Sequence, residues 1–435
     1  MEFPNLNTCK NLISAFATAA LVAGCGGGSD DSPTPAPVDT RNTMVEPAQV
    51  VRWSIPGFDG IAIAGVAAAT DGGVWTVGAE GGLYGRPFLR KIGGSANNPC
   101  GTDGLRYVEE LSTRFERRQG PTSISTVQDG TFYVGFVAVG RVYAARFDEA
   151  TCRLDTGFGD QGVVQVPTPR FATVQALNVR RHTDGHVLTA LTITGAVELR
   201  RFDATGQWDT GFGTEGLAVN PNTDGFWFGG LAVGADGQIL VSGSVILPFS
   251  TRPALLRLDA QGKPVASFGD GGVQRYPEIT GVAGALGLLV EQDRVVFVGG
   301  TATSVATSDF GSNDSFIAAA DLATGRLLPG FGDGGFLRWD WGYGNSNQIF
   351  SIVPNGRGGY TTCGHTIRSL VAGQPAALVD ITGTGQFDAS VPYQGRRLIA
   401  GTNAAGCAGM ARLPDGRLAV GINDAKQVVV AFFAQ

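Results

Sequence analysis

A five-residue phrase built on Phe-Gly returns about every 56 residues along this chain of 435 residues. Its clear copies are FGDQG at 158–162, FGTEG at 212–216, and FGDGG at both 268–272 and 331–335, with weaker versions at 100–104 (CGTDG) and 387–391 (FDASV). Self-similarity at a fixed period of this size indicates stacked supersecondary units that bury their apolar faces against one another. The repeat therefore constrains the fold more than any local motif does.

A second repeated element is a dipeptide that favours a tight turn. It stands between two predicted strands in which apolar and polar residues alternate. Asp-Gly and Asn-Gly supply the positive φ that short hairpin turns need. Such dipeptides begin at Asp71, Asp129, Asp184, Asp236, Asn355 and Asp415, and Gln292-Asp293 takes the same place in the fifth unit. The chain therefore contains seven hairpins, which indicates seven units.

The unit around Asp236 shows the full pattern. Two strands flank the Asp-Gly turn (GLAVGA and QILVSG), a third reads PALLRLD, and a fourth reads GVQRY at 272–276, with the Phe-Gly phrase between the last two. Four short antiparallel strands per unit, without helical periodicity, describe a propeller blade. We predict an all-β protein, a seven-bladed β-propeller of four-stranded antiparallel blades.

The two ends of the chain complement each other. The seventh hairpin is followed by only one more strand, at 428–433, so its blade lacks a fourth strand. One strand stands unassigned before the first hairpin, AQVVRWSI at 48–55, and its VVRW is similar to FLRW at 336–339. We predict that it pairs beside 428–433 and closes the ring, which removes open sheet edges.

The amino-acid sequence of the repeat also resembles that of a known family. LLRLDAQGKPVASFGDGGV at 255–273 and RRFDATGQWDTGFGTEGLAV at 200–219 resemble the delta-60 repeat of bacterial exported proteins. That family is typified by an arginine-containing strand, an Asp-x-x-Gly turn and a Phe-Gly phrase. The resemblance covers most of 60–435. It implies a β-propeller-like fold, and it carries no common catalytic residues.

The N-terminus indicates export. Residues 12–23 form an apolar run that is too short to span a bilayer and is typical of a signal peptide. The sequence LVAGC, ending at Cys25, resembles the lipobox of bacterial lipoproteins, which implies that Cys25 is lipidated. The alternative is an ordinary cleaved signal with Cys25 incidental. We predict a lipoprotein signal peptide at 1–24.

The segment after Cys25 contains little that could be buried, so we predict a disordered tether at 25–46 and the propeller at 47–435. Gly26 stands where many lipoproteins retained on the inner membrane carry aspartate. The predicted location is therefore the outer membrane, with the domain facing the periplasm or the cell surface.

Four cysteines remain once Cys9 is removed with the signal and Cys25 is lipidated. An even number in an exported chain favours disulfides. We predict two pairs, each between neighbouring repeats: Cys100 with Cys152, and Cys363 with Cys407. Zinc is a poor alternative, since no two cysteines stand at ligand spacing.

Charge and composition bound the partners and the chemistry. The formal net charge of −6 argues against nucleic acid as a partner, and we expect a monomer without cofactor or metal. Calcium at the Phe-Gly phrase is an alternative to turn and packing roles, but each loop offers one aspartate where calcium takes six or more oxygens. The three histidines have no carboxylate fixed near them in sequence, and we expect His182 and His186 at the surface.

The innermost strands argue against an enzyme. They read as small and apolar, with no convergent acid, base or metal ligands, although loop residues could still provide catalysis as a hydrolase or lyase. The connections between blades carry aromatic and acidic residues suited to stacking and hydrogen bonding. These candidate ligand contacts are Phe171, Asp224, Phe226, Trp227, Phe228, Asp340, Trp341 and Tyr343. We predict a non-catalytic binding module for a glycan or an envelope protein; a structural scaffold of the envelope is a further alternative.

Overall fold

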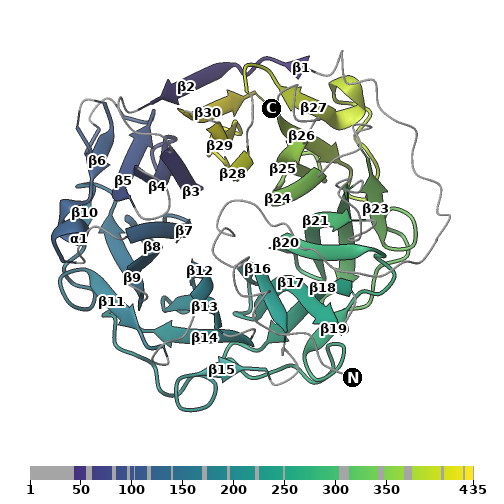
Figure 1. Cartoon of the computed structure of the whole chain (residues 1–435), viewed down its shortest axis with the longest axis horizontal. Coiled ribbons are helices and arrows are strands. Elements are labelled where there is room, and N and C mark those ends of the chain that lie inside the picture. Colours follow the sequence, from purple (N-terminus) through teal and green to yellow (C-terminus); the bar gives the residue numbers. More distant parts are fainter. Residues whose placement is uncertain are drawn as a thin grey trace, which may run out of the picture.

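Seven antiparallel sheets surround a central axis in the computed structural model (Figure 1). The structure describes residues 44–434, except for 55–60, 81–84, 96–97, 102, 115–118, 139–140, 169–173, 194–195, 221–224, 248–249, 303–312, 341–346, 367–374, 403–405 and 425–426. The predicted fold class is confirmed: the chain is a seven-bladed β-propeller, and its described helices are limited to α1 (Glu109–Arg114) and the 3-10 turn η5 (Pro392–Gly395).

Each blade runs from an innermost to an outermost strand, and we number the blades from the first complete one. Blade 1 contains β3 (Ile61–Ala68), β4 (Val74–Glu80), β5 (Arg86–Ile92) and β6 (Leu105–Tyr107). Blade 2 contains β7 (Gln119–Ile124), β8 (Thr131–Ala138), β9 (Arg141–Asp148) and β11 (Val163–Val166), with β10 (Arg153–Leu154) also paired to β9. Blade 3 contains β12 (Val174–Arg181), β13 (Val187–Ile193), β14 (Ala196–Phe202) and β15 (Ala218–Val219).

The remaining blades follow the same plan. Blade 4 contains β16 (Phe226–Val233), β17 (Ile239–Leu247), β18 (Ser250–Leu258) and β19 (Val273–Arg275). Blade 5 contains β20 (Val282–Val290), β21 (Arg294–Ala302), β22 (Asn313–Asp321) and β23 (Phe336–Trp339). Blade 6 contains β24 (Asn347–Pro354), β25 (Tyr360–Thr366), β26 (Ala376–Ile381) and β27 (Arg396–Ile399). Blade 7 contains β28 (Gly406–Arg412), β29 (Leu418–Asp424), β30 (Gln427–Phe433) and β2 (Gln49–Trp53).

The ring closes as the sequence predicts. Strand β2 pairs antiparallel with β30, from Gln49 opposite Phe432 to Trp53 opposite Val428, and supplies the outermost strand of blade 7. One detail differs from the predicted boundary. Met44 and Val45, assigned to the tether, form β1 and pair in parallel with β27 of blade 6, so the ordered fold begins before residue 47.

The buried apolar residues form seven clusters, one at each junction between neighbouring blades of the described chain. Both faces of every sheet are therefore covered, one by the preceding blade and the other by the next. An open blade would leave one such apolar face in water, which explains why closure of the ring matters for stability.

The repeated Phe-Gly phrase joins one blade to the next. Its phenylalanines are at most 2% exposed: Phe158, Phe212, Phe268 and Phe331. The glycine that follows each of them donates its backbone N–H to a turn carbonyl of the next blade, as from Gly213 to Gln261 over 2.7 Å. The same bond occurs from Gly159 to Thr205, Gly269 to Thr324 and Gly332 to Thr384. The phrase is thus a structural lock at four junctions.

A glycine in the next blade makes room for this lock. A Cβ added at Gly262 would lie 2.6 Å from the ring of Phe212, and the φ of +80° at Gly262 also disfavours other residues. An arginine of the third strand adds a second tie, because Arg201 lies 4.9 Å from the Phe212 ring centroid and donates to the Ala260 carbonyl over 2.9 Å. The arginine, phenylalanine and glycine typical of the repeat therefore meet at one place.

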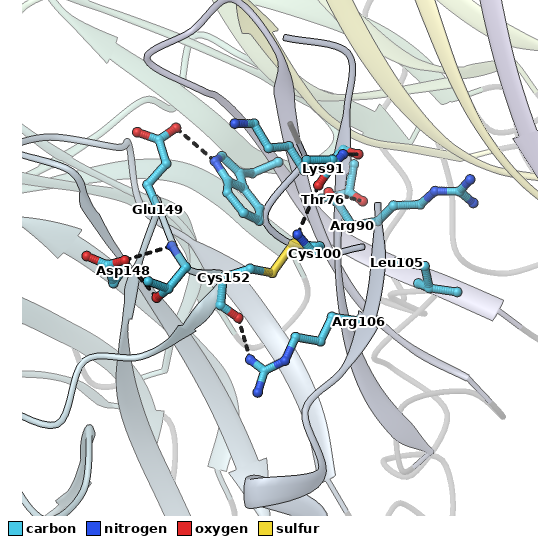
Figure 2. The surroundings of a disulfide bond; sticks show 12 residues. Thr76, Arg90, Lys91, Cys100, Leu105, Arg106, Asp148, Glu149 and Cys152 are labelled. Atoms are coloured by element: carbon cyan, nitrogen blue, oxygen red, sulfur yellow. Dashed lines mark hydrogen bonds between the residues drawn. A yellow bond between two sulfur atoms is a disulfide. The ribbon is translucent and has the colours of Figure 1, made fainter. Parts of the chain in front are cut away.

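Both predicted disulfides are present, and each joins two blades. Cys100 and Cys152 link blades 1 and 2, with Cα atoms 5.4 Å apart, and Cys152 lies beside Asp148, Glu149 and Arg106 (Figure 2). Cys363 of β25 and Cys407 of β28 link blades 6 and 7, with Cα atoms 5.9 Å apart. The covalent links thus occur at two junctions that do not carry an intact Phe-Gly phrase.

Candidate functional site

The antiparallel order of each blade places its connections at two ends of the ring. The turn between the first and second strands and the Phe-Gly turn between the third and fourth lie at one end. The connection between the second and third strands lies at the other end, together with the link to the next blade. We call this second end the loop face. All the predicted ligand contacts belong to segments at the loop face.

Four of the eight predicted contacts lie outside the described residues: Phe171, Asp224, Trp341 and Tyr343. The other four are placed by the structure at the loop-face ends of blades 4 and 5. Phe226, Trp227 and Phe228 begin β16, and Asp340 directly follows β23. The structure therefore brings the described candidates to the predicted end of the molecule.

Phe226 takes the position of a core residue. Its side chain is fully buried in the apolar cluster between blades 3 and 4, so it contributes to packing. Gly243, on the facing strand, allows this position, because an added Cβ there would lie 2.3 Å from the Phe226 ring. Alternation along the strand turns Trp227 to the opposite side of the sheet, where it is half-buried.

Two exposed residues at the same end of blade 4 were not predicted from the sequence. Ile246 and Leu247, at the end of β17, are 43% and 40% exposed. Ile246 donates its N–H to the Gly225 carbonyl over 2.9 Å, and Trp227 lies opposite Ser244, so all three residues belong to one hairpin end. Alternation along β17 places Ile246 on the same side of this hairpin end as Trp227, and Leu247 on the other side. We call Trp227, Ile246 and Leu247 the apolar patch. The signal in the sequence was the run VIL directly before a connection, where polar residues are usual.

An ion-pair cluster lies at the loop-face end of blade 5. Asp314 is 4% exposed and accepts a bond from Arg338 Nε over 2.5 Å. Burial raises the pKa of Asp314, the Arg338 guanidinium opposes this rise, and the charge of Asp340 adds to it. Because Arg338 also lies 3.5 Å from the Thr280 hydroxyl, the cluster ties β22 and β23 to the segment before β20.

The innermost strand of every blade contains a β-bulge. Each has one residue more than the strand it pairs with, and this locally bends and twists the strand. The extra residues are Ala64, Thr122, Gln175, Gly229, Leu286, Phe350 and Ala408. None of these seven positions carries an ionisable side chain.

Charged residues in or directly after the innermost strands hold neighbouring blades together. Arg180 donates to the Ile124 carbonyl of blade 2 over 3.1 Å, and its burial lowers its pKa to about 10. Glu291 accepts from the Tyr360 hydroxyl of blade 6 over 3.0 Å, and Arg412 lies 3.3 Å from the Pro354 carbonyl. These side chains are engaged in contacts between blades, as expected of structural groups.

His182 is not at the surface, contrary to the sequence-based expectation. It is 3% exposed, and its Nε2 lies 2.8 Å from the Gly237 carbonyl in the next blade, while its Nδ1 lies 2.7 Å from Asp184. The turn of blade 4 covers a position that appears exposed when blade 3 is considered alone. His365 is half-buried beside Phe350, and burial lowers its pKa to about 4.

Two further observations concern metals and membranes. Within the part of the chain that the structure describes, no three His, Cys, Asp or Glu side chains are grouped so as to hold a metal ion. None of the described helices is long and apolar enough to cross a membrane.

Comparisons with known proteins identify no family for this chain. No protein-family model matches the chain, and no curated protein matches it. Similar solved structures include the Dos1 propeller, at 11% identity over 86% of this chain and 78% of that one, with a TM-score of 0.41. A glucose dehydrogenase is 13% identical over 72% of this chain and 96% of that one, with a TM-score of 0.41. Sqt1 of Chaetomium thermophilum, in a structure bound to the N-terminus of ribosomal protein L10, is 12% identical over 87% of this chain and 98% of that one, with a TM-score of 0.43. Likeness at this level carries no conclusion about function.

Proposed function

We propose that this chain is a cell-envelope lipoprotein of the delta-60 repeat type whose propeller binds a partner at the loop face without catalysing a reaction. The lipobox-like sequence ending at Cys25 supports the anchor. The two disulfides support an oxidising compartment such as the periplasm or the cell surface. The outer membrane is the proposed location, because Gly26 follows the cysteine.

The apolar patch carries the binding part of the proposal. Ile246 is exposed on the same side of the hairpin end as the aromatic residue Trp227, and Leu247 is exposed at the tip of the same hairpin, so this end presents apolar surface where a partner can bind. Ile246 and Leu247 are 43% and 40% exposed, so each leaves part of its apolar surface in contact with water. The ligand is a glycan or an envelope protein, and the aliphatic side chains favour a protein.

A double substitution tests the binding surface. We expect Ile246→Ser/Leu247→Ser to reduce retention of the partner from purified envelope extract at least tenfold, with an unchanged melting temperature, because both side chains are already exposed. Tyr393→Ser is the matched control, since Tyr393 is 42% exposed on η5, outside the loop face. Equal retention by all three proteins would exclude the apolar patch, and no retention by any of them would favour the scaffold role.

A single substitution tests the anchor. We expect Cys25→Ser to move the protein from the membrane fraction to the soluble fraction, because the acyl chains provide the attachment. The fractions are compared by immunoblot after cell disruption and high-salt washing. Continued membrane attachment of the variant at wild-type level would contradict lipidation of Cys25.

A further inference from the structure

A groove lies at the outer edge of the ring between blades 2 and 3. One wall is the outermost strand of blade 2, β11, and the other is the turn that follows β14 in blade 3. Its volume is about 440 Å³, which lies within the usual range for small-molecule sites, about 300–1,000 Å³. The residues that line it include Asp160, Gln165, Pro167, Gln207 and Trp208.

Trp208 is the most distinctive residue of this groove. It is 41% exposed, yet its indole is held in place, because Nε1 donates to the Gly216 carbonyl over 3.0 Å. Gly216 lies directly against the ring, since an added Cβ there would be 2.5 Å from Nε1. An aromatic surface that is exposed and already oriented loses little entropy when a ligand stacks on it.

The repeat does not require tryptophan at this position. In each of four blades, one residue after the turn forms an isolated β-bridge with a residue near the end of the third strand. That residue is Trp208 in blade 3, Pro264 in blade 4, Leu327 in blade 5 and Phe387 in blade 6. Proline and leucine satisfy the same backbone arrangement, so the fold needs only an apolar residue there. The fold of the repeat therefore does not explain why blade 3 carries an exposed indole at this position.

The turn that carries Gln207 and Trp208 is rigid. The Asp203 carboxylate accepts bonds from the Thr205 N–H over 2.8 Å, the Thr205 hydroxyl over 2.7 Å and the Gln207 N–H over 2.9 Å. These bonds lower the pKa of Asp203 against the opposing effect of burial, so the carboxylate stays charged and the turn stays closed near neutral pH. The groove is thus largely formed before any ligand arrives.

The polar groups of the groove suit hydroxyl groups. Gln165 and Gln207 are exposed planar amides that can both donate and accept, and Asp160 adds a carboxylate. Arg141 donates to Gln165 Oε1 over 3.3 Å, which orients that amide. None of the described residues that line the groove is Lys, Arg or His, so nothing in the lining favours an anionic ligand.

We propose that this rim groove is a binding site for a neutral glycan, with one sugar ring stacked on Trp208 and its hydroxyls bonded by Gln165, Gln207 and Asp160. A sugar presents an apolar C–H face and a rim of hydroxyls, which match the indole and the amides of the groove. This site is independent of the apolar patch, because it lies on another part of the molecule and uses other residues.

The test uses the full chain and neutral hexasaccharides of glucose, xylose and N-acetylglucosamine, titrated by calorimetry and by Trp fluorescence. We expect the wild type to bind at least one of them. Trp208→Leu should weaken that binding about tenfold or more, since stacking is lost, and Trp208→Phe should retain part of it. Leucine and phenylalanine occupy the equivalent positions of blades 5 and 6, so both variants should fold.

Two controls make the result specific. Tyr393→Ser, on η5 of blade 6, should bind the hexasaccharide as the wild type does, because Tyr393 is exposed and lies outside both the groove and the apolar patch. Gln165→Ala/Gln207→Ala should weaken binding without changing the melting temperature. The proposal is overturned if the wild type binds none of the three neutral hexasaccharides. It is equally overturned if Trp208→Leu binds as tightly as the wild type, or if only an anionic sugar or a peptide binds at Trp208.

Discussion

Deleting residues 44–54 is expected to unfold the propeller. The deletion removes β2, whose five residues pair with β30, and leaves blade 7 without its outermost strand. It also removes Trp53, which is 8% exposed, packs edge-on against Phe88 of blade 1 at 6.4 Å and lies under the Arg90 guanidinium. Loss of a buried tryptophan alone costs about 3–5 kcal/mol, a large part of the roughly 5–15 kcal/mol that stabilises a typical domain.

The deletion is measured by thermal unfolding followed by circular dichroism, with solubility recorded in parallel. We expect a melting temperature lowered by well over 10 °C or no cooperative transition, together with aggregation through the exposed edge of β30. A matched deletion of residues 30–40, which leaves β1 and β2 intact, should melt as the wild type does. A stable, soluble 44–54 deletion would show that ring closure contributes little.

The features predicted correctly from the sequence are those that recur. Six Asp-Gly or Asn-Gly turns, the Gln292-Asp293 turn and a regularly spaced Phe-Gly phrase define the blades. The missing fourth strand of the last blade can be supplied only by the spare N-terminal one. The disulfides followed from the same repeat, because cysteines in neighbouring units are brought together when the units stack. Periodicity thus predicted both the architecture and its covalent links.

The prediction was less accurate for individual side chains, for a physical reason. Each sheet is buried on both faces, so alternation along a strand does not separate inside from outside. Phe226 was predicted as a ligand contact because it stands in a connection between blades, but it lies in a core cluster. His182 was expected at the surface because it flanks a hairpin turn, but the next blade covers it. Trp208 and Ile246 were missed because their exposure depends on how two blades, or two strands, meet.

At the junction between blades 1 and 2, a disulfide takes the place of the phenylalanine-on-glycine contact found between other blades. In blade 1 the Gly104 carbonyl accepts a hydrogen bond from the Lys91 N–H, and in blade 4 the Gly272 carbonyl accepts the same bond from the Arg257 N–H. Gly104 and Gly272 are therefore equivalent, and the residues four positions before them, Cys100 and Phe268, are equivalent as well. Cys152 stands where other blades have the turn glycine, and it shares the positive φ, +57°. The disulfide therefore occupies the position of the phenylalanine-on-glycine contact.

Removing either disulfide is expected to lower the free energy of unfolding by about 4 kcal/mol, since the linked residues are 52 and 44 positions apart and chain entropy depends only weakly on this difference. The variants are Cys100→Ala/Cys152→Ala and Cys363→Ala/Cys407→Ala, compared by denaturant unfolding. The double variant Cys100→Phe/Cys152→Gly should recover part of the loss at the first junction, because it restores the lock of the other blades. Cys100→Ala/Cys152→Gly is its control. If the Phe/Gly variant were no more stable than this control, the correspondence between the two kinds of contact would have no energetic meaning.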